Sequence, residues 1–367
     1  MVRFLPRMIG SLLGCLVLMA PELRGQELIS LSPELILSGE LFGKVAAIAV
    51  DRQGQILVAD ARAYQIVLFD AAGQARDTLG RRGEGPGEFQ FPLHRLTYLP
   101  ETDVLYALEL FSSRLHAWRL SPEIEWLGTR PLTSSLTEAY RVEAIWAWGP
   151  DSLVLHVVER RRGRNAHNAE ALQWYHWTLR QQTMLFSLRP AEAIRTEVSY
   201  TTLPFLARTL VDVRPGRGIA WLWSDSLIVH IYHPRGQRQY HRPFRISRRL
   251  PFTQAQWKQA VDRMRQLAPP MYKSLRYPRP QRNYWPYTDD LLLDDQGRVW
   301  LRLQPGPEAT SRTVYLVVSE KGQRQLVLEG MVDLEVVQQG QAWGIRNIAE
   351  GIKEVVRYRL LFNSAEE

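Results

Sequence analysis

Short apolar runs separated by polar turns recur along most of the chain. The clearest series lies within residues 46–98, with runs at 47–50, 56–59, 66–69 and 75–79. These runs contain β-branched and aromatic residues, and Gly- or Asp-bearing turns separate them at intervals of roughly nine or ten residues. This spacing is typical of antiparallel hairpins, so the region is predicted to form four consecutive β-strands.

Weaker copies of the same pattern follow. Each copy has two runs that are expected to be the middle strands of a further unit. These are 103–107 and 114–118, 151–155 and 174–179, 225–229 followed by Gly236, 293–301 and 314–318, and 341–345 and 354–358. Periodic units of this size indicate a repeat architecture, and the first series and its copies make six units. A strand near 28–37 is expected to join the last unit and close the ring, which removes a free sheet edge.

The first unit carries a specific resemblance. The stretch AIAVDRQGQILVAD, followed by IVLFDAAGQARDTLGRRGEGPGEFQFP, resembles an NHL-type blade of the six-bladed, TolB-like β-propeller superfamily. The resemblance implies four-stranded blades and a Gly-rich link that leads to the innermost strand of the next blade. We therefore predict an all-β, six-bladed β-propeller with four-stranded antiparallel blades, which forms a single domain over residues 26–367.

One segment departs from the β pattern. Thr253–Gln256 has the form of a capping box, and Pro269-Pro270 ends the helical pattern. Apolar residues at helical spacing fill the interval: Trp257, Val261, Met264 and Leu267. The sequence predicts an amphipathic helix near 253–268, inserted between the fourth and fifth blades and packed on the propeller.

The amino terminus has the features of a secretory signal. Residues 1–25 contain two early Arg residues and an apolar run at Met8–Ala20, which is too short to span a bilayer. Cleavage after Gly25 would leave a protein exported to the periplasm or the extracellular space, with no transmembrane segment. Leu12–Cys15 also resembles a lipobox, so a lipid anchor through Cys15 is the alternative.

Charge and composition narrow the function classes. The chain has 46 Lys+Arg, 38 Asp+Glu and one Cys, and its formal charge is +8. Loss of residues 1–25 lowers this charge to +6 and removes the Cys, which excludes thiol chemistry unless Cys15 is lipidated. Arg160–Arg164 and Arg245–Arg249 are basic clusters, but an exported protein rarely meets nucleic acid, so no nucleic-acid partner is predicted.

Searches for catalytic signatures favour a non-catalytic role. Gly83–Gly87 leads to a strand rather than a helix, which disfavours a phosphate-binding loop. His230 and His233 are three apart on a predicted strand and so face opposite sides. The Asp294–Gly297 stretch lacks the downstream Glu of a calcium loop and is predicted to be a hairpin turn. No metal site and no cofactor are predicted.

Ligand-binding residues are expected where propeller loops gather around the central channel. On that basis the candidates are His94, Arg95, Tyr140, Arg141, Tyr284 and Trp285, together with Asp60 and Arg82. Aromatic and Arg side chains suit a sugar, a peptide or a carboxylate. We predict a monomeric exported module that binds a peptide, a glycan or an envelope protein. The alternatives are a metal-dependent hydrolase resembling gluconolactonase-type propellers, for which no ligand residues can be matched, and a structural envelope-assembly protein.

Overall fold

The computed structural model describes most of the chain. The described residues are 28–109, 114–132, 136, 139–159, 169–176, 178–179, 181–195, 200–202, 206–233, 238–246, 249–267, 276–304, 312–349 and 352–360. The predicted signal segment at 1–25 lies outside them.

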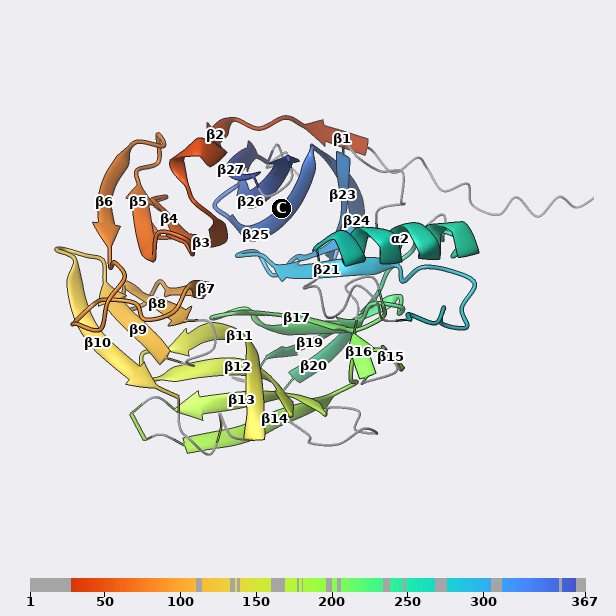
Figure 1. The fold of residues 1–367 in the computed structure, drawn as a ribbon, viewed down its shortest axis with the longest axis horizontal. Helices are drawn as coiled ribbons and strands as arrows, with labels where there is room; N and C mark the ends of the chain where they lie inside the picture. The colour runs from red at the N-terminus through yellow and green to blue at the C-terminus, as the bar shows by residue number, and fades with distance from the viewer. Residues whose placement is uncertain are drawn as a thin grey trace, which may run out of the picture.

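Six sheets form the blades of a β-propeller (Figure 1), which confirms the predicted fold class. The first three blades are β3 (Val45–Val50), β4 (Ile56–Asp60), β5 (Gln65–Phe69) and β6 (Ala75–Leu79); β7 (Leu93–Leu99), β8 (Val104–Glu109), β9 (Arg114–Arg119) and β10 (Glu125–Pro131); and β11 (Tyr140–Gly149), β12 (Ser152–Glu159), β13 (Glu170–His176) and β14 (Gln181–Leu188). The last three are β17 (Thr209–Arg214), β18 (Gly218–Trp223), β19 (Ile228–His233) and β20 (Arg238–Pro243); β21 (Thr288–Leu293), β22 (Val299–Leu303), β23 (Arg312–Ser319) and β24 (Gly322–Glu329); and β25 (Met331–Gln338), β26 (Gln341–Ala349) and β27 (Ile352–Arg359).

The amino-terminal segment closes the ring in two places. Strand β2 (Leu35–Leu37) pairs antiparallel with β27 and completes the sixth blade, as predicted for the 28–37 region. Strand β1 (Leu28–Leu31) pairs in parallel with β24 and gives the fifth blade an additional outer strand, which the sequence pattern did not predict. A short 3₁₀ helix, Gly39–Leu41, then leads into β3.

A separate buried cluster fills each of the six interfaces between neighbouring blades. Between the sixth and first blades, for example, Trp343 packs in one cluster with Ile48 and Val58. Because each blade buries both faces against its neighbours, its middle strands are apolar on both sides, and all five residues of β4 are buried. This explains why the middle strands gave the strongest sequence signal.

Repeated Asp-x-x-Gly-x turns end the hairpins on one face of the propeller, here called the turn face. In the turn beginning at Asp51, the carboxylate accepts the backbone N–H groups of Gln53 and Gln55, each at 2.8 Å. Gly54 has φ +80°, a conformation that glycine adopts without strain. Turns beginning at Asp70 and Asp294 make the equivalent bonds. The predicted Asp294–Gly297 hairpin turn is therefore observed.

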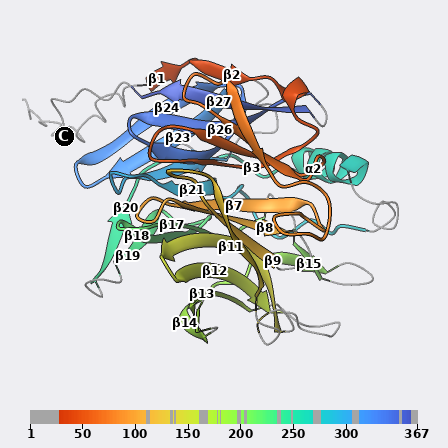
Figure 2. The same cartoon turned by 90° about the vertical axis from the view of Figure 1, so that its left-hand side faces the viewer.

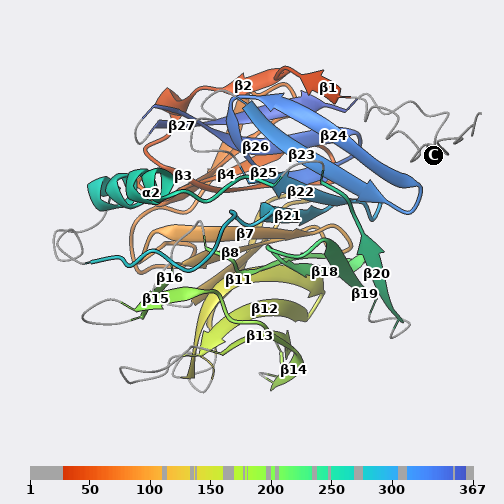
Figure 3. The same cartoon turned by 90° about the vertical axis from the view of Figure 1, so that its right-hand side faces the viewer.

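The links between blades lie at the opposite face, here called the link face. Two links are enlarged: one carries the hairpin of β15 (Ala193–Arg195) and β16 (Tyr200–Thr202), and the other carries helix α2 (Gln254–Leu267). Figures 2 and 3 show α2 and β15 at the same end of the molecule. The predicted helix is confirmed, and its capping box is reciprocal, since Gln256 N–H donates to Thr253 Oγ1 (3.2 Å) and Thr253 N–H to Gln256 Oε1 (3.1 Å).

The Gly-rich link between the first two blades is a compact loop. Its backbone forms bonds between Arg81 and Phe89 (2.8 Å) and between Gly83 and Phe89 (3.0 Å). Phe89 is fully buried, and a Cβ atom on Gly80 would lie 2.2 Å from its ring. Glycine at position 80 is therefore required by the close approach of a buried aromatic ring, in keeping with a structural role for this link.

Candidate functional site

A central channel runs where the six innermost strands meet. Residues of β3, β7, β11, β17, β21 and β25 line a cavity of about 950 Å³. These are the strands that converge at the centre of Figure 1. The volume lies within the range typical of small-molecule and cofactor sites, so this channel is the candidate site.

Two carboxylates in the channel lack an ion-pair partner among the described residues. Asp290 and Glu335 are both half-buried and lie on the neighbouring strands β21 and β25. Desolvation raises the pKa of Asp290 to about 6 and that of Glu335 to about 7, and the charge of Asp333 adds to both shifts. Holding these groups ionised is therefore costly unless a cation or a hydrogen-bond donor approaches them.

An unsatisfied cation lies in the same channel. The Nε atom of Arg95, on β7, is buried and has no hydrogen-bond partner within the described part of the chain. Arg95 is close enough to Glu335 to lower the pKa of that carboxyl, but the two form no salt bridge. Arg95 and Glu335 therefore line the same cavity without forming an ion pair with each other.

Other channel charges are engaged. Asp212 accepts a bond from Trp146 Nε1 (2.8 Å) and one from the backbone N–H of Leu293 (2.6 Å), and so connects the third, fourth and fifth blades. Burial raises the pKa of Asp212 to about 6 in spite of these bonds. Arg214 donates to Gln338 Oε1 at 2.6 Å. These groups connect neighbouring blades. Glu335, in contrast, has no hydrogen bond or ion pair among the described residues, whereas Asp290 keeps a backbone bond at Leu291 and lies near the Arg302 charge.

The channel also contains a His–Glu pair. His156 Nε2 lies 3.2 Å from Glu170 Oε2, and Glu170 Oε1 accepts the backbone N–H of Ala191 at 2.7 Å. Both residues line the cavity. Within the described residues, no group of three His, Cys, Asp or Glu side chains is placed to hold a metal ion.

The sequence-predicted site residues divide between the channel and its surroundings. Arg95 and Arg141 line the channel, where Arg141 forms an ion pair with Glu143. His94, next to Arg95 in the sequence, is half-buried, and desolvation together with the Arg95 charge lowers its pKa. Tyr140 packs partly buried against the cluster between the second and third blades.

The remaining four candidates lie elsewhere on the link face. Asp60 is buried and accepts four backbone N–H groups from the surrounding loops, including those of Gly43 (2.7 Å) and Lys44 (2.9 Å). Arg82 is exposed, with its guanidinium 5.3 Å from the centroid of the Tyr64 ring. Trp285 is 4% exposed beneath α2, whereas the neighbouring Tyr284 is 44% exposed.

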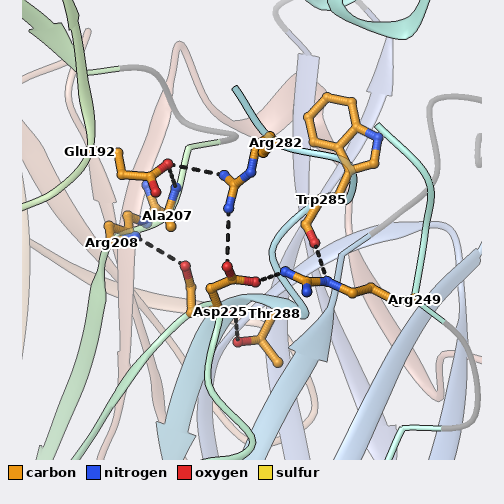
Figure 4. Close-up of polar contacts among 9 residues, drawn as sticks. Glu192, Ala207, Arg208, Asp225, Arg249, Arg282, Trp285 and Thr288 are labelled. Atoms are coloured by element: carbon orange, nitrogen blue, oxygen red, sulfur yellow. Dashed lines mark hydrogen bonds and ion pairs between the residues drawn. The ribbon is translucent and has the colours of Figure 1, made fainter. Parts of the chain in front are cut away.

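A charged network joins the helical insertion to the propeller beside the channel mouth (Figure 4). Arg282 bonds to Glu192 (3.0 Å) in one enlarged link and to Asp225 (3.2 Å) in the fourth blade. Arg249 also pairs with Asp225 and donates to the carbonyl of Trp285 at 3.2 Å. These contacts hold the insertion against the rim of the link face.

Sequence reasoning missed Glu335, Asp290 and Asp212. Each is an acidic residue within an otherwise largely apolar innermost strand, such as Thr-Leu-Val-Asp-Val-Arg at β17. That anomaly was a usable signal, because a charge placed inside a buried strand needs an explanation. The apolar pattern does not by itself locate the innermost strands of the fourth to sixth blades, so it does not place these carboxylates at the channel.

Comparison with known proteins supports the fold and goes no further. No protein-family model and no curated protein matches the chain. Among solved structures, a "Putative exported protein" from Bacteroides fragilis NCTC 9343 aligns with TM-score 0.52 and 8% identity over 90% of this chain and 99% of its own. A member of the DUF4221 family from Bacteroides vulgatus ATCC 8482 aligns with TM-score 0.51 and 10% identity over 90% and 97%.

The protein is thus a six-bladed β-propeller, as predicted from the sequence. Among the described residues, no helix is both long enough and apolar enough to cross a membrane.

Proposed function

We propose that the protein is an exported, non-catalytic propeller whose central channel binds a peptide. The observation that carries the proposal is that Arg95 and Glu335 line one cavity and that neither forms a salt bridge within the described residues. A peptide supplies the matching pair of groups, a carboxylate for the arginine and an ammonium for the glutamate. A neutral glycan supplies neither charge, so it satisfies these two groups less well.

Export rests on the signal-like residues 1–25. Mass spectrometry of the protein recovered from its native host tests this part. A mature chain that begins at Gln26 supports a soluble exported form. A lipidated Cys15 supports the anchored alternative, and an uncleaved Met1 overturns export.

Binding is tested with oligoalanines of three to six residues, because they carry an ammonium and a carboxylate and little else. We expect them to raise the melting temperature of the purified protein. An N-acetylated or a C-amidated version is expected to bind at least about tenfold more weakly, as each loses one charge-assisted contact. Maltotetraose serves as the neutral glycan probe, and tighter binding of maltotetraose would replace the peptide with a sugar.

Two substitutions link the charges to their partners. Glu335→Gln should abolish the penalty for N-acetylation, and Arg95→Gln should abolish the penalty for C-amidation, as in a double-mutant cycle. Glu101 is exposed and is not itself a channel-lining residue, so Glu101→Gln is the matched control and should change neither penalty. Binding that ignores both channel substitutions would contradict the proposed site.

A hydrolase is the second candidate, and the channel-lining His156–Glu170 pair favours it. A histidine held by a carboxylate can act as a general base toward water. Mass spectrometry of the same oligoalanine mixtures decides between the two roles. Shortened products that disappear in a His156→Ala variant would show catalysis, and intact peptides after prolonged incubation support binding alone.

A further inference from the structure

We propose that a second cavity beside the channel, called the side pocket, holds an apolar side chain of the bound peptide. This inference rests on the proposed peptide-binding function and adds a specificity to it. The side pocket has a volume of about 360 Å³. It lies at the link face, between the helical insertion and the fifth and sixth blades.

The exposed surface of the side pocket is mainly apolar, although charged residues such as Arg249 and Arg312 also line it. The apolar side chains come from three parts of the chain. They include Ile246 and Leu250 from the insertion, Leu303 and Val314 from the fifth blade, and Met331 from the sixth. All five side chains are only half-buried, so part of their apolar surface is exposed. Covering this surface with an apolar group is favourable at roughly 25 cal/mol per Å².

The side pocket and the central channel share a wall. Arg302 and Asp333 line both cavities and form an ion pair, and Arg302 Nε also bonds to Asp289 Oδ1 at 2.6 Å. Asp333 also contributes to the electrostatic environment of Glu335 in the channel. The two cavities are therefore adjacent, and the proposal places the charged end of the ligand in the channel and a neighbouring group in the side pocket.

A polar atom in the side pocket favours a peptide over an acyl chain. Gln304 lines the pocket, and its Oε1 is buried without a hydrogen-bond partner in the described residues. A buried acceptor left unsatisfied costs free energy, and a peptide backbone N–H can fill it. An acyl chain offers no donor, so the pocket chemistry matches an apolar side chain on a peptide backbone.

The test uses tetraalanine and its four single-leucine variants. Each leucine adds three carbon atoms, so the variant whose leucine reaches the side pocket should bind about tenfold to a hundredfold more tightly than tetraalanine. The other three variants should match tetraalanine within about threefold, which sets the baseline for the comparison. Octanoate serves as the acyl probe.

Two filling variants test the location. Ile246→Phe and, separately, Val314→Phe should remove the leucine advantage while tetraalanine binds as before, which also shows that the variant is folded. Ile352→Phe is the matched control, because Ile352 is 45% exposed on β27 and does not line the pocket. It should retain the full leucine advantage.

The outcomes separate this inference from the function on which it rests. If tetraalanine binds and depends on Arg95 and Glu335 but leucine gives no advantage at any position, the side pocket is refuted and the proposed function stands. A leucine advantage that survives both filling variants also refutes the side pocket. Octanoate binding that exceeds that of every peptide replaces the peptide side chain with an acyl chain. If no peptide binds, both proposals fall.

Discussion

Buried carboxylates on the turn face and in the central channel differ in their hydrogen-bond partners. On the turn face, Asp294 is fully buried, and it accepts the backbone N–H groups of Gln296 (2.9 Å) and Arg298 (2.8 Å) as well as Trp300 Nε1 (2.8 Å). In the channel, Glu335 has no such partner among the described residues, and desolvation raises its pKa to about 7. The first carboxylate stabilises the fold, whereas the second lowers stability at neutral pH.

The difference suggests how the fold separates structure from function. On the turn face, backbone N–H groups take the place of water as hydrogen-bond donors to the carboxylates. These bonds offset the free-energy cost of burying the charge. The compensation is incomplete at Asp51, where burial raises the pKa in spite of the backbone hydrogen bonds and the charge of Asp103 adds to the shift. A channel carboxylate without such donors lowers the stability of the folded protein, and a bound ligand can offset this loss.

The largest expected effect is at the turn face. Asp294→Ala removes the acceptor for two backbone N–H groups, for Trp300 Nε1 and for the Arg298 guanidinium at 2.6 Å. Breaking a buried charged network typically costs about 3–5 kcal/mol, and urea unfolding at pH 7 measures the loss. Asp70→Ala, in the equivalent but exposed turn, should cost clearly less. Equal losses at the two turns would break the comparison.

An intermediate effect is expected at Asp212, which shares features of both regions. Asp212→Ala leaves the Trp146 indole N–H and the Leu293 backbone N–H without an acceptor. Leaving a buried donor unsatisfied costs about 1–3 kcal/mol. The two donors bond to different carboxylate oxygens, so Asp212→Asn keeps an acceptor for only one of them and should recover only part of the loss. If alanine and asparagine are equally destabilising, the negative charge rather than hydrogen bonding holds the three blades together.

An effect of the opposite sign is expected at Glu335. Its folded-state pKa of about 7 exceeds the unfolded value, so the native state keeps a proton that the unfolded chain loses first. The resulting stabilisation is complete below pH of about 4 and is lost as the pH rises through about 7. The stability of Glu335→Gln relative to wild type should therefore be higher at pH 8 than near pH 5. Urea unfolding of both proteins between pH 5 and pH 8 checks this dependence, and parallel curves would contradict it.

Much of the fold was predictable from sequence because middle strands are buried on both sides. The runs at 56–59 and 66–69 became β4 and β5, and the Thr253–Gln256 capping box began α2. The parallel pairing of β1 with β24 was not predictable, since four residues at the amino terminus carry no register signal for a strand some 300 positions away. The closure of the propeller ring, rather than the local sequence pattern, brings β1 beside β24.

The candidate site was predictable only in part. Arg95 and Arg141 follow the start of an innermost strand, and propeller geometry alone placed them at the channel. Glu335 and Asp290 could not be assigned, because their lack of partners depends on which side chains face them across the axis. Trp285 shows the converse: its type suggests a ligand platform, but its ring packs 4.7 Å from that of Phe252 in the core beneath α2.

The most direct test of the account measures stability and binding together in Glu335→Gln. Urea unfolding and oligoalanine titration, both at pH 8, provide the two quantities for this variant, wild type and Glu101→Gln. The account predicts unchanged or increased stability and a loss of at least about tenfold in affinity for Glu335→Gln, with no change in the control. A variant that loses stability, or one that binds oligoalanine as tightly as wild type, would contradict it.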